Sequence, residues 1–221
     1  MLSNRHVFWQ AFLIAFVIFW FGILIGIAFE ESRVQEVEGF YFDSQTDLFD
    51  LELSSNIVYG SNLSCDNLYL ASVGFADKIY KEASKLEKYD DSNKLTSDLI
   101  SLHRRYDLMR TSLWMDIVSV NKKCGNKTDI VIYLYDYVDP SLTDRATQGA
   151  MSSFLVELKG RYGDDIILIP IAVDTGVESL VVLREHYNLD RVPMIFVNQN
   201  YKFSTLDSLK NIESILYNNA S

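Results

Sequence analysis

The sequence predicts an α/β domain that follows a membrane-spanning helix and an antiparallel helical hairpin. Three observations support this fold class. Residues 7–29 are apolar except for Gln10, residues 66–123 repeat apolar side chains with helical periodicity, and residues 129–217 alternate strand-like with helix-like segments. With 221 residues and 48% hydrophobic side chains, the chain is long enough to bury a core.

The apolar run at residues 7–29 predicts an anchor in the lipid bilayer. At 1.5 Å per residue it can cross a hydrocarbon core of roughly 30 Å. Arg5 precedes the run and Glu30 follows it. The positive-inside tendency therefore predicts that residues 1–6 are cytoplasmic and that the chain after residue 30 lies outside the cell membrane. A cleaved signal peptide is the alternative, because residues 26–28 (Gly-Ile-Ala) have the small-x-small pattern of a cleavage site.

Two further expectations concern the anchor and the segment after it. Gly22 and Gly26 have the GxxxG spacing through which two spans form a homodimer, although glycine is also common in membrane helices for other reasons. Residues 30–64 are expected to form a stalk or linker. A helix that continues out of the membrane and an irregular connection are both compatible with this segment.

Residues 65–124 predict the helical hairpin. Apolar side chains recur at steps of four and three across residues 95–120, which is a heptad seam, and a second apolar face covers residues 69–86. Residues 90–93 (Asp-Asp-Ser-Asn) supply turn and N-cap chemistry between the two helices. Such a seam is typical of packing between two helices, and binding of a partner helix is the alternative.

The only two cysteines, Cys65 and Cys124, flank this hairpin. Folding the chain at the turn brings both to the same open end, and an even cysteine count outside the cytoplasm favours a disulfide. A redox-active pair and two free thiols are the alternatives. The wide separation in sequence favours a structural bond, as does the position of Cys124 at a helix C-terminus, where the dipole disfavours a thiolate.

Residues 125–221 predict the α/β domain itself. The predicted order is strand, helix, strand, helix, strand, strand, helix, at residues 129–137, 141–162, 166–173, 177–188, 194–197, 201–203 and 206–217. We expect the strands that helices separate to pair in parallel, through right-handed crossovers. We expect the last two strands to pair as an antiparallel hairpin.

This order resembles the thioredoxin fold, with Val192-Pro193 at the position of that family's cis-proline and residues 194–203 at its terminal hairpin. The family's Cys-x-x-Cys motif has no counterpart, because residues 138–148 contain no cysteine. Without a thiolate at this helix N-terminus, thiol–disulfide exchange is not expected there. The whole chain resembles membrane-anchored thioredoxin-like proteins of archaea, in which a signal anchor and a cysteine-flanked helical pair precede the redox domain.

The resemblance implies a binding site. In the thioredoxin family, the residue before the cis-proline presents its backbone to an extended substrate, as one β-strand is added to another. The equivalent residue is Val192, with Pro193 fixing the turn. The facing loop supplies Tyr137, Asp139 and Ser141.

Binding of a protein or peptide, as a chaperone or scaffold, is therefore the function that we expect, rather than catalysis. One alternative is an extracytoplasmic thiol–disulfide oxidoreductase that uses Cys65 and Cys124. Another is a structural subunit of a surface complex. A net charge of −10 argues against nucleic acid as a partner, since phosphates require a basic surface.

No cofactor or metal site is expected. The three histidines, His6, His103 and His186, have no ligand-like spacing, and His103 is expected on the polar side of the hairpin seam. The aspartates of the 136–144 segment cluster near the loop that lacks the redox motif. They are compatible with a carboxylate pair or a weak cation site, but loop solvation and helix N-capping explain them more simply.

The sequence also contains three candidate glycosylation sites, at Asn62, Asn126 and Asn219. Such triplets also arise by chance in a chain rich in Asn and Ser. They therefore support an extracellular location only weakly.

Overall fold

A computed structural model describes residues 8–26, 63–90, 97–125 and 128–219, together with residues 46, 49, 50, 53, 56–58 and 60. The chain divides into two compact units, Met1–Asp47 and Leu48–Ser221, and each is described by itself. The predicted cytoplasmic residues 1–6, most of the predicted stalk and the candidate sites Asn62 and Asn126 lie outside the described residues.

Within the first unit, Phe8–Gly26 form a helix that is long and apolar enough to cross a membrane. The aromatic rings of Trp9, Phe12, Phe16 and Trp20 follow one another along it at centroid distances of 6.0, 6.3 and 6.1 Å. Length and composition thus agree with the predicted anchor. The side of the membrane on which each end lies, and a homodimer through the two glycines of the helix, stay predictions.

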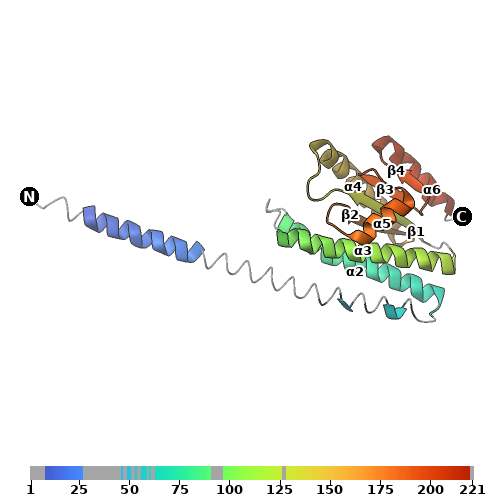
Figure 1. The fold of residues 1–221 in the computed structure, drawn as a ribbon, viewed down its shortest axis with the longest axis horizontal. Helices are drawn as coiled ribbons and strands as arrows, with labels where there is room; N and C mark the ends of the chain where they lie inside the picture. The colour runs from blue at the N-terminus through green and yellow to red at the C-terminus, as the bar shows by residue number, and fades with distance from the viewer. Residues whose placement is uncertain are drawn as a thin grey trace, which may run out of the picture. The chain divides into compact units, whose positions relative to one another are not determined.

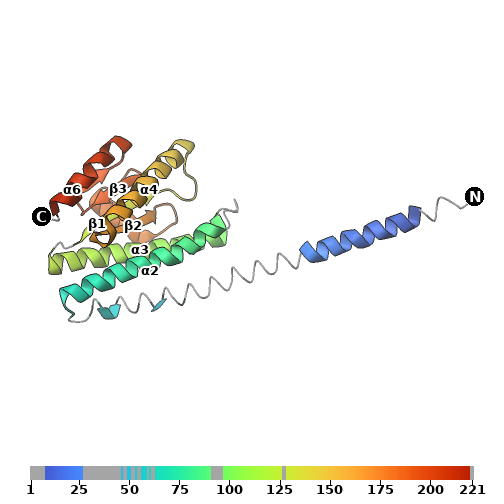
Figure 2. The same cartoon turned by 180° about the vertical axis from the view of Figure 1, so that it is seen from behind.

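The second unit begins with the helical hairpin, formed by α2 (Cys65–Asp90) and α3 (Ser97–Cys124). The two helices lie side by side in both views (Figures 1 and 2). A disulfide joins Cys65 at the start of α2 to Cys124 at the end of α3, so the helices are antiparallel and the predicted pairing is confirmed. Much of the predicted seam is buried, through Leu99, Leu102, Tyr106, Leu113, Ile117 and Val120 of α3 and Tyr69 and Ile79 of α2. Met109 of α3 and Val73, Ala76 and Ala83 of α2 are half-buried.

A buried amide ties the open end of this hairpin to the sheet. The Tyr69 hydroxyl lies 2.7 Å from Asn121 Oδ1 and 2.5 Å from the Gly125 carbonyl oxygen. The Asn121 amide in turn donates to the Thr128 carbonyl at 3.0 Å, just before the first strand. Because buried polar groups need partners, these bonds fix how the chain leaves α3.

The sheet contains four strands, in the order β2-β1-β3-β4. They are β1 (Asp129–Tyr135), β2 (Ile166–Ala172), β3 (Met194–Val197) and β4 (Tyr201–Phe203). As predicted, β1 and β2 are parallel and β3 and β4 form an antiparallel hairpin.

The expectation that β3 also pairs in parallel is wrong, because β3 lies antiparallel to β1, on the edge of β1 opposite β2. The outer edge of β2 is a poor partner for a further strand. Pro170 has no N–H, and the Ala172 N–H donates to the Asp107 carboxylate of α3 at 3.1 Å. The next strand therefore joins the free edge of β1.

Helices cover both faces of the sheet. On one face lie α4 (Leu142–Tyr162) and α6 (Ile212–Asn219), on the side of the sheet away from the hairpin (Figures 1 and 2). Their core includes Val131, Tyr133, Ile195 and Val197 of the sheet, Met151, Leu155 and Leu158 of α4, and Leu209, Ile212 and Leu216. The predicted last helix starts instead as a 3-10 helix, Leu206–Asn211, and becomes α-helical only at Ile212.

The other face is covered by α3 together with α5 (Glu178–Tyr187). Trp114 of α3 is fully buried there, with its ring centroid 5.5 Å from that of Tyr187 and 6.1 Å from that of Phe196 in β3. Because α5 has only 10 residues, α3 supplies a large part of the cover on this face. The hairpin is thus a structural layer of the second unit.

Replacing both Cys65 and Cys124 by serine is expected to lower the free energy of unfolding by about 4 kcal/mol, because the bond closes a loop with a sequence separation of 59. Urea unfolding of the full-length protein in detergent measures the difference. The wild-type protein with and without a dithiol reductant serves as the matched comparison. An unfolding free energy that is unchanged in the double variant would show that the bond does not stabilise the fold.

Candidate functional site

The sheet register brings the predicted site segments to one end of the sheet. Leu134 of β1 lies opposite Met194 of β3, and Tyr135 lies opposite Ala172 of β2. The loop after β1, the turn after β2 and the residues before β3 therefore all meet where β1 ends. This end of the sheet, with residues 136–141, 173–176 and 191–193, is named the loop end below.

Val192 and Pro193 lie at the loop end directly before β3. Their peptide bond is cis, as the sequence resemblance implies. Pro193 is buried and Val192 is half-buried. Within the described part of the chain, the backbone N–H and C=O of Val192 form no hydrogen bond. Backbone groups without partners at the end of a strand can pair with an extended chain.

The loop after β1 is held by Asp174, which follows β2. Its carboxylate accepts hydrogen bonds from the backbone N–H groups of Tyr137, Val138 and Asp139, at 2.8, 2.7 and 3.4 Å. Three successive N–H groups that converge on one carboxylate form an anion-binding loop, here filled from within the chain. Sequence reasoning did not identify Asp174.

The remaining predicted loop residues, Asp139 and Ser141, are exposed. Ser141 is the N-cap of α4, and its hydroxyl accepts a hydrogen bond from the Asp144 N–H at 3.1 Å. This bond satisfies one of the N–H groups that a helix leaves free at its start. The helix that follows the first strand thus begins with ordinary capping chemistry.

Tyr137 is fixed by a second contact, with the hairpin. Its ring stacks on the ring of His103 from α3, with centroids 3.7 Å apart and planes inclined by 28°. The expectation that His103 lies on a polar, solvated face is wrong, because its side chain is buried. The physical reason is that α3 is covered on two sides, by α2 and by the sheet with its loop end.

The Asp107 carboxylate lies at the centre of a buried polar network between α3 and β2. Asp107 is 0% exposed. One carboxylate oxygen accepts from the Ala172 N–H, and the other accepts from the Thr175 hydroxyl at 2.9 Å. Arg110 Nη1 lies 3.5 Å from the first oxygen. Burial raises the pKa of Asp107, while Arg110, the two hydrogen bonds and the charge of His103 act in the opposite direction.

Acidic side chains lie at and beside the loop end. Burial raises the pKa of Asp136, and the carboxylates of Asp174 and Asp144 raise it further, whereas Arg184 lowers it. No set of three or more acidic, histidine or cysteine side chains could hold a metal ion within the described residues. The carboxylate of Asp174 accepts the bonds from the loop N–H groups, that of Asp144 accepts from the Ser141 hydroxyl, and Asp139 is exposed.

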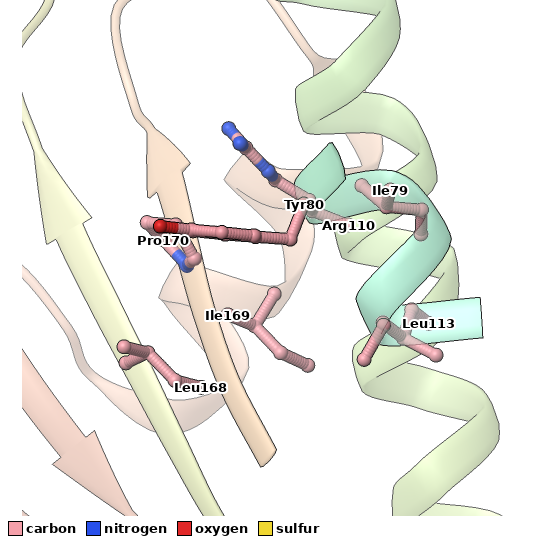
Figure 3. A pocket seen from close by; sticks show the side chains of 8 residues that line it. Ile79, Tyr80, Arg110, Leu113, Leu168, Ile169 and Pro170 are labelled. Atoms are coloured by element: carbon pink, nitrogen blue, oxygen red, sulfur yellow. The ribbon is translucent and has the colours of Figure 1, made fainter. Parts of the chain in front are cut away.

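A shallow cleft lies beside the outer edge of β2, away from the loop end. Figure 3 shows side chains of α2 and α3 facing this strand. The lining residues are Ala76, Ile79, Tyr80, Arg110, Leu113, Leu168, Ile169 and Pro170. This edge is a poor site for strand addition, since Pro170 has no N–H and Asp107 takes the outward N–H of Ala172.

The disulfide lies at the opposite end of the sheet from Val192. Cys124 precedes β1, whereas the loop end begins after β1. Seven residues of β1 separate them, which is roughly 20 Å at the usual rise of a strand. The structure thus brings Val192, Pro193 and the 136–141 loop together and keeps both cysteines apart from them.

A sequence signal for the missed network existed in α3. A second stripe consists of His103, Asp107, Trp114 and Val118, each one position after a residue of the heptad seam. All four are buried. A helix with two buried stripes packs on two sides.

Comparison of the chain with protein-family models, with characterised proteins and with solved structures finds no match.

The raised pKa of Asp107 predicts a pH dependence of stability. The folded protein holds the proton on Asp107 more tightly than the unfolded chain does. This contribution to the free energy of unfolding is therefore present below the unfolded pKa of about 3.9 and is lost as pH rises through the folded pKa. Between pH 4 and pH 7, the wild-type protein should lose stability relative to Asp107→Asn, which cannot titrate at this position.

Chemical unfolding of both full-length proteins in detergent at the two pH values measures this difference. Asp77→Asn on the exposed surface of α2 removes the same charge and is the control, which should track the wild-type protein. A stability difference between wild type and Asp107→Asn that stays constant with pH would contradict the account.

Proposed function

We propose that this chain is a single-pass membrane protein that displays a thioredoxin-like domain without redox activity outside the cytoplasm. The domain binds an extended segment of a protein or peptide, as a chaperone or scaffold does. In this proposal residues 7–29 hold the chain in the lipid bilayer, and the hairpin and the domain form the part that meets the partner.

The thioredoxin-like assignment is supported by the order β1-α4-β2-α5-β3-β4-α6 in residues 125–221. It is supported further by the position of Pro193 directly before β3 and by the loop that runs from β1 into α4 at the place of the family's redox motif. No thiol is present in that loop, so the chemistry of thiol–disulfide exchange has no nucleophile there.

The observation that carries the binding proposal is the backbone of Val192. Its N–H and C=O make no hydrogen bond in the described part of the chain, and they lie at the end of a sheet. An extended partner would pair with these groups as an added strand, and its side chains would meet Tyr137 and the exposed Asp139 and Ser141.

The oxidoreductase alternative, with Cys65 and Cys124 as the active pair, is disfavoured by two observations. The bond lies at the end of the sheet opposite Val192, so a substrate held at the loop end would not reach it. Lys122 and Lys123 are exposed near Cys124, but the carbonyl end of α3 opposes a thiolate there. A structural subunit of a surface complex is the remaining alternative.

Val192→Asp is expected to weaken partner binding, because an unpaired carboxylate would enter the contact between Val192 and the added strand. The probe is a photo-crosslinking amino acid in place of Leu142, which is 86% exposed at the start of α4, beside the loop end. In native membranes, the yield of crosslinked partner should fall by about tenfold or more, which corresponds to about 1.4 kcal/mol of binding free energy.

The matched control is Val182→Asp, because Val182 is 64% exposed on α5 and the substitution introduces the same charge elsewhere on the domain. This control should crosslink as the wild-type sequence does, and both variants should unfold at the wild-type temperature. Equal crosslinking by the Val192→Asp protein would rule out Val192 as part of the binding site.

A further inference from the structure

We propose that Asp174 is a positioning residue of this binding surface, which fixes the 137–139 loop in one conformation opposite Val192. The inference rests on the proposed function, in which the loop and Val192 bind the partner together at the loop end. Its physical basis is the set of hydrogen bonds that the loop makes, and these can be measured without a partner.

The first step is the number of donors that Asp174 collects. Three consecutive N–H groups of the loop point to one carboxylate, and the two shorter bonds measure 2.7 and 2.8 Å. Hydrogen bonds from neutral N–H groups to a carboxylate are stronger than those between neutral groups. The Asp174 carboxylate thus accepts the N–H groups of this loop in the way that a bound phosphate accepts those of a phosphate-binding loop.

The second step is that Asp174 is itself held in place by the hairpin. Ala172, two residues before Asp174, and Thr175, directly after it, both donate to the buried Asp107 carboxylate of α3. Gly176 completes the turn at a φ of 82°, a conformation that glycine adopts readily. The contacts therefore run without interruption from α3 through the turn after β2 to the loop after β1.

The third step is the charge at the loop end. Burial raises the pKa of Asp136, the carboxylates of Asp174 and Asp144 raise it further, and Arg184 lowers it, so the negative charge of Asp174 lies close to Asp136. Like charges so close together are unfavourable, and the loop N–H groups offset this cost at Asp174. An uncharged side chain would avoid the repulsion but could not accept all three bonds equally well.

A consequence for recognition follows. The N–H groups of residues 137–139 already donate to Asp174. A partner at the loop end would therefore contact the backbone of Val192 and the side chains of the loop. The ring of Tyr137 is held in its orientation by stacking on the ring of His103. Freeing the loop would therefore weaken binding without touching Val192.

The test is amide hydrogen exchange of the full-length protein in detergent, with ¹⁵N labelling. In Asp174→Ala, the amides of Tyr137 and Val138 should exchange at least about tenfold faster, and their proton resonances should move upfield as the bond to the carboxylate is lost. Amides in the middle of β1, such as Ile132, should keep their wild-type exchange. Asp165→Ala, which removes an exposed carboxylate before β2 instead of after it, is the control.

The same variants carry the crosslinking probe at Leu142. Faster exchange at Tyr137 and Val138 together with a crosslinking yield reduced at least about fivefold would support the proposal. Unchanged exchange at these amides would overturn it, as would faster exchange with a wild-type yield. If the wild-type protein itself gives no crosslink that depends on Val192, the proposed function fails, while the exchange data still decide whether Asp174 holds the loop.

Discussion

The Asp107 carboxylate is the interaction on which the arrangement of the second unit depends. An ionisable group that is 0% exposed is costly to bury unless donors surround it. Here the donors are the backbone N–H of Ala172 at the end of β2, the hydroxyl of Thr175 in the turn after it, and Arg110 on the same helix. The bonds can form only when α3 lies in one register against β2. Packing of apolar side chains alone would allow the helix to slide.

The hairpin is therefore fixed to the sheet at both ends of the sheet. At one end Asn121 and Tyr69 join the end of α3 to the entrance of β1, close to the disulfide. At the other end Asp107 holds the turn after β2, and His103 holds the ring of Tyr137. Since α5 is short, α3 also covers the face that α5 leaves open. A disulfide in this helix pair stabilises the layer that supports the loop end. In our proposal the two cysteines therefore have a structural role.

Much of the fold was predictable because it depends on local patterns. The heptad seam, the apolar strands, Gly163 after α4 and Pro193 before β3 all mark boundaries that chain chemistry determines. The direction of β3 was not predictable in this way, because it depends on the closed outer edge of β2, which only Asp107 and Pro170 together produce. For the site, Val192 and the loop followed from the resemblance, whereas Asp174 and Asp107 were missed. Single aspartates at the end of a strand or inside a helix are indistinguishable in sequence from solvated ones.

The most direct test of the account is the redox behaviour of Cys65 and Cys124 in the full-length protein. Thiol trapping in glutathione buffers of graded potential measures the midpoint, and reduction of insulin measures turnover. The account predicts a bond that is reduced only below about −300 mV, with no turnover, as expected for a structural disulfide. A midpoint near about −200 mV with measurable turnover would contradict it and would make the hairpin, rather than the loop end, the functional centre of this protein.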